Sequence, residues 1–484
     1  MKTFPKKALL YLSLLLVLGC SKELPEVEEN NPTEINSVEA PELTRRINTF
    51  IKDAMVDVYL WYKEMPSINQ NAEFDSKAYF KKLLVTEDKW SMVTDDIQAL
   101  ENSFQGIEKA YGYSLAFGRF SNQPENYFAV VQYVYPRTPA SRAGFERGDI
   151  IIQLNSGNIN AGNYRSLLSG EALTVTKGVL TANGITTGVT VSMAAEELNL
   201  NPVLMYKVIE QGSHRIGYLL YTQYIDRYND SLNVAFQYFK DRNITDLVLD
   251  LRYNPGGSTS AAQHLCSSIA PEQVVNSDQA LVTYQWNDKY QNYWTTQGRK
   301  DQMMVGFKST VPIKLNLNRM QVLTSKGSAS ASELTITGLE PYMNLTLVGD
   351  TTYGKYTASI TVKPTHMGYT PTQLAGMENW GIQPIVIRFA NSQGVTNFKN
   401  GFAPNHQVRD ELLPAQPLGS LTEPLLKKAV ENITGTPPIA MKSAIAVPDY
   451  VIFDSGFSKF DEFKKNLPIN DFIDVNDVFL RDLN

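Results

Sequence analysis

The sequence predicts a multidomain α/β protein, of the broader α+β kind, and two observations carry this prediction. Apolar strand-like runs alternate with helical patterns between residues 203 and 438, as at 247–251 and then 260–269. Repeated strand and helix units are typical of a sheet covered by helices. A chain of 484 residues is also long enough for several cores, so more than one domain is expected.

Composition excludes several classes of function. Hydrophobic residues make up 43% and charged residues 19% of the chain, which is ordinary for a globular protein. The formal net charge is −6 and no basic stripe is present, so nucleic acid is not an expected partner. No His, Cys, Asp or Glu cluster has metal-ligand spacing, and there is no phosphate-binding glycine motif, so no metal or cofactor is predicted.

The first 40 residues predict a lipid-anchored envelope protein of a bacterium. Three lysines precede an apolar run at 8–18, which is too short for a comfortable membrane span, and Val17-Leu18-Gly19-Cys20 is similar to a bacterial lipobox. We expect removal of residues 1–19, lipidation of Cys20, an acidic tether at 20–40, and membrane contact through the lipid alone. A plain secretory signal with an incidental cysteine is the alternative. The second cysteine, Cys266, lies in a helical pattern and is predicted to be a buried free thiol.

Residues 41–104 predict a small helical domain, because Ile47, Ile51 and Met55 follow a helical period. Residues 105–200 favour strands, at 128–134 and 150–154, with a short helix at 141–144 that a glycine ends. Between 203 and 438 we expect a strand at 216–220, a helix at 231–242 capped by Ser231, and a closing helix at 418–429. Five aromatic residues either line a groove or pack a core: Tyr284, Trp286, Tyr290, Tyr293 and Trp294.

A run of small residues at 327–333, Gly-Ser-Ala-Ser-Ala-Ser-Glu, opens into a helical pattern and is followed by a strand at 345–349 and by Lys355. A serine at a helix start lies beside backbone N–H groups that suit a developing oxyanion. A partly desolvated lysine of lowered pKa can act as its base. The alternative is that the small residues serve only a linker or tight helix packing.

Four motifs in order resemble the C-terminal processing (tail-specific) serine proteases, as in a PDZ-containing lipoprotein member of that family. They are Pro-Ala-Ser-Arg-Ala-Gly-Phe-Glu-Arg-Gly-Asp-Ile-Ile at 139–151, Leu-Asp-Leu-Arg-Tyr-Asn-Pro-Gly-Gly at 249–257, the serine run at 327–333, and Val-Gly-Asp-Thr-Thr-Tyr-Gly-Lys at 348–355. The resemblance implies a crotonase-like protease core at 203–438 and a PDZ-like domain at 105–200. Residues 439–484 form an extension without a motif.

The resemblance also implies roles for individual residues. Ser330 would be the nucleophile and Lys355 the general base. An oxyanion hole would come from Gly256 or Gly257 with the N–H of Ala331. Many members have a glutamine that orients the lysine where this chain has Ser359, so Ser359 is a possible orienter.

The PDZ-like domain would hold the carboxylate of a peptide near Tyr113, Ser114 and Leu115, unless it is only a spacer. These assignments lead to two hypotheses. The first is a Ser/Lys endopeptidase that cleaves unfolded or C-terminal segments of proteins, guided by the PDZ-like domain. The second is a catalytically inactive peptide-binding scaffold of the same fold, which the missing glutamine favours. A Ser-His-Asp site has no sequence support, because none of the four histidines lies in a motif with a spaced acidic partner.

Overall fold

The computed structural model describes residues 39–121, 123–181, 184–438, 449–457 and 469. The chain divides into two compact units, Met1–Glu39 and Ala40–Asn484, and all that follows concerns the second unit. The expected leader, Cys20 and most of the expected tether lie outside the described residues. Among the residues that are described, no helix has both the length and the apolar character needed to cross a membrane.

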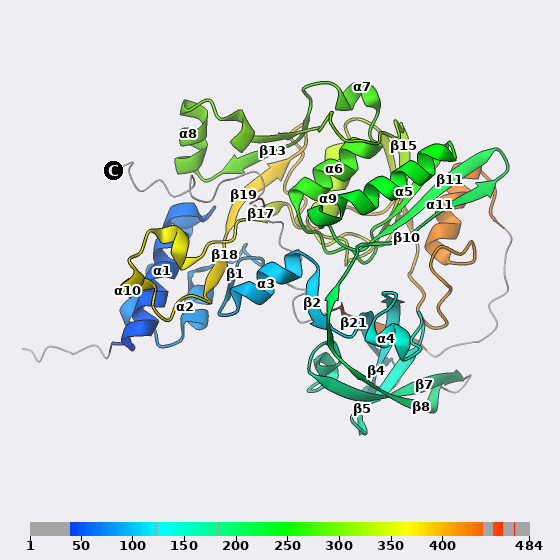
Figure 1. The fold of residues 1–484 in the computed structure, drawn as a ribbon, viewed down its shortest axis with the longest axis horizontal. Coiled ribbons are helices and arrows are strands. Elements are labelled where there is room, and N and C mark those ends of the chain that lie inside the picture. Colours follow the sequence, from blue (N-terminus) through cyan, green and yellow to red (C-terminus); the bar gives the residue numbers. More distant parts are fainter. Residues whose placement is uncertain (1–38, 122, 182–183, 439–448, 458–468, 470–484) are drawn as a thin grey trace, which may run out of the picture. The chain divides into compact units, whose positions relative to one another are not determined.

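The N-terminal part is helical, as its periodicity predicts (Figure 1). Ile47, Ile51 and Met55 of the first helix are buried, as the helical period requires, while Leu43 is exposed. One short strand in this part pairs antiparallel with a strand from far along the chain, at Met92 opposite Gln383. The elements are α1 (Glu42–Val58), α2 (Ser76–Leu83), β1 (Met92–Thr94), α3 (Ile97–Phe104) and the partner strand β18 (Gly381–Gln383).

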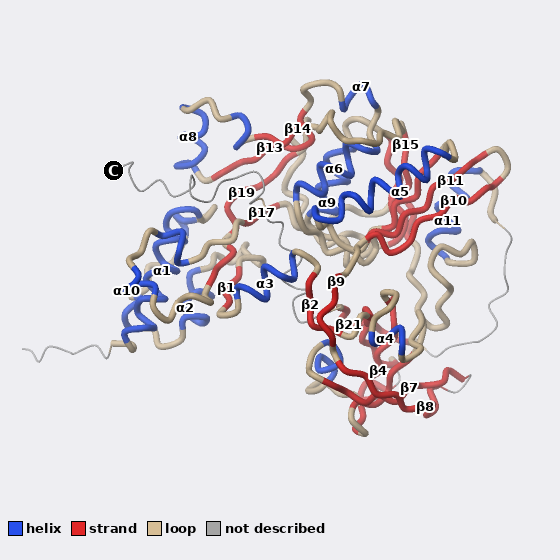
Figure 2. The backbone as a smooth tube through the Cα atoms, in the orientation of Figure 1, coloured by secondary structure: helices blue, strands red, loops and turns tan. Residues whose placement is uncertain are grey.

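A strand-rich domain follows (Figure 2). Its main sheet has the order β21-β3-β4-β5-β7-β8, and every pair in it is antiparallel. The strands are β3 (Tyr113–Phe120), β4 (Gln123–Val134), β5 (Ile150–Leu154), β6 (Gly157–Asn158), β7 (Ala172–Thr181), β8 (Gly184–Ala194) and β21 (Tyr450–Gly456). The helix α4 (Pro139–Arg142) and the pair β2 (Ile107–Ala110) and β9 (Glu196–Asn199) complete it.

The third part is built on a six-stranded mixed sheet of order β10-β11-β12-β15-β16-β20. Its pairs are parallel except for β10 with β11 at one edge. The strands are β10 (Val203–Gln211), β11 (His214–Tyr221), β12 (Asp246–Asp250), β15 (Arg319–Thr324), β16 (Asn344–Gly349) and β20 (His406–Gln407).

Helices cover both faces of this sheet. Residues of α5 (Asn229–Asp241), α6 (Thr259–Ile269) and α9 (Ala331–Leu339) share one buried apolar cluster with Leu247 and Leu249 of β12. Residues of α11 (Pro424–Thr434) share another with Val248, the residue between them, because successive strand residues point to opposite faces. Figure 1 shows α5, α6 and α9 grouped together. Cys266 is a buried free thiol on α6, as predicted.

A smaller antiparallel sheet of order β14-β13-β19-β17 packs beside this core. Tyr290 and Trp294 of its covering helix are almost completely buried, so these aromatic residues pack a core and the packing interpretation is correct for them. The elements are α7 (Glu272–Val275), β13 (Ala280–Trp286), α8 (Asp288–Thr296), β14 (Met304–Gly306), β17 (Thr357–Ser359), α10 (Pro371–Leu374) and β19 (Ile385–Ala390).

The short helix predicted at 141–144 begins at Pro139 instead, and two predicted helix starts in the sheet domain are also wrong. Ser231 does not cap α5, which begins at Asn229, and its hydroxyl accepts a hydrogen bond from Asn201 instead. The closing helix begins at Pro424 rather than at 418, because the Glu423 carboxylate accepts the N–H groups of Leu425 and Leu426 and proline suits the first helical position.

Candidate active site

The three loops that carry the catalytic motifs leave neighbouring parallel strands at the same edge of the sheet. Asp250 ends β12 and pairs with Leu323 of β15, which in turn pairs with Val348 of β16. The carboxyl ends of adjacent parallel strands form the place where α/β proteins bind ligands. The glycine turn, the serine run and the lysine loop follow β12, β15 and β16 in that order.

Hydrogen bonds join the serine run to the turn after β12. The Ser328 hydroxyl donates to the Leu251 carbonyl at 2.8 Å, and the Ser332 hydroxyl donates to the Asn254 carbonyl at 2.9 Å. The Ala329 N–H also donates to the Asn254 carbonyl, at 3.2 Å. Two of the three alternating serines therefore have structural tasks.

Ser330, the middle serine, differs from both of its neighbours. It is fully buried, and its hydroxyl has no hydrogen-bond partner among the described residues. Its backbone has φ 59° and ψ −111°, which a residue with a side chain rarely adopts. Such strain collects at functional sites, where surrounding contacts hold the residue in place. Ser330 stands at the N-cap position of α9, at the start of the helix.

The two glycines of the turn have distinct environments. A Cβ on Gly256, where φ is +111°, would lie 2.7 Å from the Cβ of Ser330 and 3.0 Å from the nitrogen of Ala331, so the turn touches the serine directly. The Gly256 N–H donates to the Asn254 side chain at 2.9 Å. Gly257 pairs with Tyr224 through a bridge that uses the Gly256 carbonyl and the Ser258 N–H rather than the Gly257 N–H.

Glu333 joins the serine and lysine loops. One of its carboxylate oxygens accepts the Ser330 N–H at 3.0 Å and the Lys355 N–H at 2.8 Å, so these two nitrogens are at most 5.8 Å apart. The other oxygen accepts the Thr352 hydroxyl and the Gly354 N–H, both at 2.6 Å. Burial raises the pKa of Glu333 to about 7, although the four donors act in the opposite direction. Glu333 thus accepts the backbone N–H of Lys355, and its charge also acts on the Lys355 amine.

Lys355 is fully buried, and burial lowers the pKa of its amine to about 7. The negative charge of Asp88, followed by that of Glu333, opposes this shift. Asp88 comes from the N-terminal helical part, where its carboxylate accepts the Tyr59 hydroxyl at 2.8 Å and the N–H groups of Trp90 and Ser91 at 2.9 Å. An amine that is substantially neutral near pH 7 can accept a proton from a serine.

Ser359 lies at the end of β17, the strand that follows Lys355, and is fully buried. Its carbonyl accepts the N–H of Ile469 at 3.1 Å. That Ser359 orients the Lys355 amine stays a prediction.

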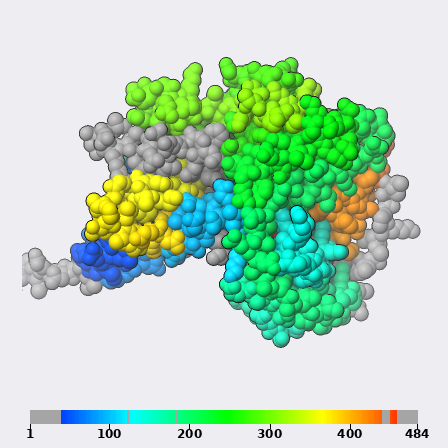
Figure 3. Space-filling view, viewed as in Figure 1, coloured from blue at the N-terminus to red at the C-terminus, as the bar shows by residue number. Residues whose placement is uncertain are grey.

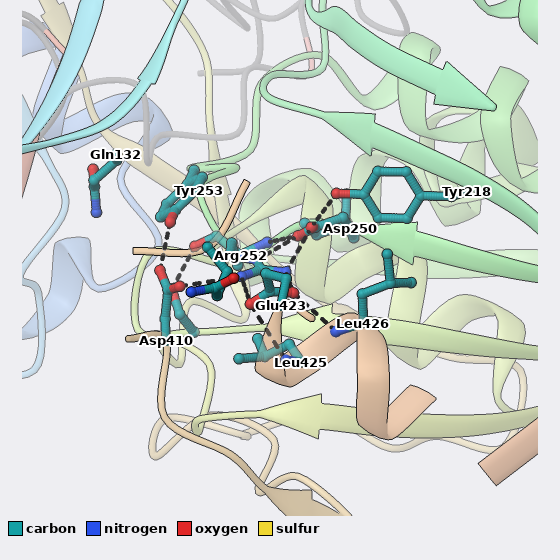
Figure 4. A network of polar contacts seen from close by, with 12 residues as sticks. Gln132, Tyr218, Asp250, Arg252, Tyr253, Asp410, Glu423, Leu425 and Leu426 are labelled. Atoms are coloured by element: carbon teal, nitrogen blue, oxygen red, sulfur yellow. Dashed lines mark hydrogen bonds and ion pairs between the residues drawn. The ribbon is translucent and has the colours of Figure 1, made fainter. Parts of the chain in front are cut away.

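A cluster of charged side chains surrounds Arg252, a residue of the motif that holds the glycine turn (Figure 4). The Arg252 guanidinium is fully buried and bonds the carboxylates of Asp250, Glu423 and Asp410. Glu423 also caps α11, so one carboxylate fixes both a helix start and the arginine beside the turn. Burial raises the pKa of Asp250 above its ordinary value despite Arg252.

The strand-rich domain reaches the same cluster through Arg147, a residue of the motif at 139–151. Its guanidinium lies 2.7 Å from Asp410, donates to the Tyr253 hydroxyl at 2.5 Å and donates to the Gln416 carbonyl at 2.9 Å. Tyr253 in turn donates to Asp410. Figure 3 shows the cyan residues of this domain adjoining the green residues of the sheet domain.

The expected peptide-carboxylate residues open β3. Tyr113 is its first residue and follows Gly112, which has φ +90°. The Ser114 hydroxyl donates to the Gln132 side chain at 2.8 Å, and Leu115 is fully buried. Their role in binding a carboxylate stays a prediction.

Sequence reasoning missed the roles of four acidic residues at this site. Glu333 stands three residues after Ser330, which is the spacing of a capping box and could have identified it. Asp88 has no motif and reaches the lysine only through the tertiary fold. Asp410 and Glu423 are likewise isolated acidic residues in sequence, and only their burial against Arg252 reveals them.

Comparisons with known proteins show which families this chain is similar to. Three family models match: the peptidase S41 N-terminal domain at 46–92, a PDZ domain at 130–176, and peptidase family S41 at 215–408. A crystal structure of a candidate S41 protease from Bacteroides fragilis NCTC 9343 superposes with a TM-score of 0.66 at 27% identity, covering 80% of this chain and 97% of that one.

Curated relatives are more distant. The carboxy-terminal processing protease CtpB of Bacillus subtilis (strain 168) is 25% identical over 54% of this chain, and the match spans about half of that protein, 48%. The chloroplastic C-terminal processing peptidase of Tetradesmus obliquus is 22% identical over 77% of each chain. Residues 215–408 of the chain therefore match the model of peptidase family S41, and they follow matches to an S41 N-terminal domain and a PDZ domain.

Proposed function

We propose that the protein is a serine endopeptidase with a Ser330/Lys355 dyad that cleaves unfolded or C-terminal segments of other proteins. One observation carries the proposal: of three alternating serines, only Ser330 is buried with an unpartnered hydroxyl and a strained backbone. The buried lysine of lowered pKa supports it, since the loops of the two residues share the Glu333 carboxylate.

The proposed reaction uses these groups in turn. The Ser330 oxygen attacks the carbonyl carbon of the scissile peptide bond, and neutral Lys355 takes the hydroxyl proton. The oxyanion that forms accepts hydrogen bonds from the N–H groups of Gly257 and Ala331, because the Gly256 N–H is already used by Asn254. The protonated lysine returns its proton to the leaving amine, and water then hydrolyses the ester on Ser330.

The test is turnover of fluorescein-labelled casein by the wild-type chain, Ser330→Ala and Lys355→Ala. We expect both variants to lose several orders of magnitude in kcat/KM. Lys326→Ala, an exposed lysine of the serine loop, serves as the control and is expected to keep wild-type turnover.

The inactive scaffold is the competing function, and the same experiment separates it. If the wild-type chain and Ser330→Ala both bind casein and neither cleaves it between pH 6 and 9, the dyad proposal fails and the scaffold takes its place. The predicted lipid anchor and envelope location are a separate proposal, for which a mass increase on Cys20 in the protein isolated from membranes is the test.

A further inference from the structure

Residues 450–456, which carry no sequence motif, form a strand of the PDZ sheet. This strand, β21, pairs antiparallel with β3, from Tyr450 opposite Phe120 to Gly456 opposite Leu115. The Ser121 N–H extends the pairing by donating to the Asp449 carbonyl at 2.8 Å. In the sheet order, β21 lies outside β3, so without it β3 would be an edge strand with unpaired backbone groups.

The other side of β21 faces the short helical turn at Tyr164–Leu168. The Tyr164 hydroxyl donates to the Asp454 carboxylate at 2.9 Å, and the Arg165 guanidinium lies 2.8 Å from the same carboxylate. The ring of Phe453 packs edge-on against that of Tyr164, with the centroids 5.4 Å apart. The segment thus lies between a sheet strand and a helical turn, held by backbone pairing on one side and side chains on the other.

This is the way in which a PDZ domain takes a peptide ligand, as a strand added to its sheet. The direction also agrees. The predicted carboxylate loop opens β3, and β21 runs with its C-terminal end toward that loop, because Gly456 lies opposite Leu115. Phe457, the next residue, is almost completely buried and packs edge-on against Tyr135, at 5.4 Å between centroids.

The side chains that face the sheet fit it closely. Gly118 lacks a side chain where Ile452 approaches, and a Cβ there would lie 3.0 Å from the Ile452 Cδ1 atom. Tyr450 lies under the Arg409 guanidinium, 4.4 Å from the ring centroid, and its hydroxyl accepts the Leu412 N–H. Val451 lies between Tyr450 and Ile452 and points to the opposite side of the strand. It is 51% exposed, as expected for the outer face of an added strand.

The next described residue along the chain contacts the peptidase domain. Ile469 is fully buried in the main apolar cluster, and its N–H donates to the carbonyl of Ser359 on β17, the strand after Lys355. Two described parts of the C-terminal extension therefore occupy the PDZ sheet edge and a strand next to the candidate catalytic lysine.

We propose that residues 449–457 are an intramolecular ligand of the PDZ peptide groove, with which the C-terminal segments of substrates compete. This inference deepens the proposed function, because it concerns the groove that would select substrates. Its test measures binding only, so it can fail or succeed whether or not the chain cleaves proteins.

The test uses the full chain with Cys20→Ser, so that the remaining native thiol is the buried Cys266. A locked variant carries Arg119→Cys and Val451→Cys, two exposed residues that lie opposite each other in the register. A released variant carries Asp454→Lys and Phe457→Ala, and Ser455→Ala, an exposed residue of the same strand, is the matched control. The probe is a fluorescein-labelled peptide of residues 449–457 with a free carboxylate, and its binding is followed by fluorescence anisotropy.

We expect oxidation of the locked variant to give a cross-linked monomer that does not bind the probe, with binding returned to the wild-type level by reduction. The released variant should bind at least tenfold more tightly than the wild type and the Ser455→Ala control. The proposal is overturned if the cysteines do not cross-link, or if they cross-link two chains. Equal affinity in the oxidised locked, released and wild-type chains, or no binding by any of them, also overturns it.

Discussion

The pH dependence of turnover tests the candidate base most directly. Burial lowers the pKa of Lys355 from its ordinary value near 10.5 to about 7. At pH 7.5 about three-quarters of the Lys355 amines would then be neutral, against roughly one in a thousand for an exposed lysine. We expect kcat/KM for labelled casein to rise about tenfold per pH unit below pH 6.5, with a midpoint near 7 and a plateau above it.

The substitution Asp88→Asn should move this midpoint in a known direction. The Asp88 charge favours protonated Lys355, so its removal should lower the lysine pKa, by about half a unit to one unit. Asparagine keeps an oxygen for the N–H groups of Trp90 and Ser91, and its amide can donate to Tyr59, so the local fold should persist. Asp95→Asn, an exposed residue of the same domain, is the control and should leave the midpoint unchanged. A wild-type rate that still rises tenfold per unit above pH 9, or a midpoint that moves upward in Asp88→Asn, would refute this account of the base.

Stability should depend on pH through the same lysine. The folded-state pKa lies below the unfolded value, so the unfolded chain binds more protons between about pH 7 and 10.5. The free energy of unfolding that Lys355 contributes therefore rises with pH across that window and is lost as pH falls to about 7. Urea unfolding of Lys355→Met should lack this slope, and the idea fails if the variant and the wild type keep parallel pH profiles.

Three further substitutions test the surroundings of the dyad. Gly256→Ala should abolish casein turnover and destabilise the chain, because the added Cβ would lie 2.7 Å from the Cβ of Ser330. The control is Gly212→Ala, where φ is also positive but no atom lies within 4 Å of the added Cβ. It should lower the free energy of unfolding in urea by only about 1–2 kcal/mol. Glu333→Gln places an amide NH₂ against two of the four donors, so we expect kcat/KM to fall about a hundredfold. The control Glu340→Gln, at an exposed neighbour, should keep the wild-type kcat/KM. Equal kcat/KM values for Glu333→Gln and the wild type would show that the carboxylate does not hold the two loops. Arg252→Met leaves the buried carboxylates of Asp250 and Glu423 unpaired and should lower the free energy of unfolding by about 3–5 kcal/mol, while Arg299→Met, which breaks an exposed pair, should cost less than about 1 kcal/mol.

Local patterns were sufficient for much of the fold. The strands at 150–154 and 345–349 and the helix at 260–269 lie within a residue or two of β5, β16 and α6, because each depends on an apolar run ended by glycine or a cap. The start of α11 was missed because the cap is Glu423, a long carboxylate that is also committed to Arg252, and no local preference signals that choice. Domain limits and the roles of the site residues stay predictions.

The candidate site was also only partly predictable: its motifs are local, but the contacts that distinguish its residues depend on the tertiary fold. Ser330 and Lys355 stand in motifs, yet what distinguishes Ser330 from Ser328 and Ser332 is the partner of each hydroxyl, which depends on the turn after β12, more than 70 residues earlier. Asp88 is further still from Lys355 in sequence, and its influence requires the N-terminal domain to pack on the peptidase domain.

The C-terminal extension is the extreme case of this dependence on tertiary context. The alternating residues at 450–456 fit a strand, but no sequence rule says which sheet edge such a strand will join. The edge is chosen by Asp454 with Tyr164 and Arg165, by Phe457 with Tyr135, and by the space over Gly118. Because we propose that this edge is the peptide groove of the PDZ domain, the position of the strand bears on function. A segment that fills a peptide groove in the direction of a ligand must leave before another peptide can enter.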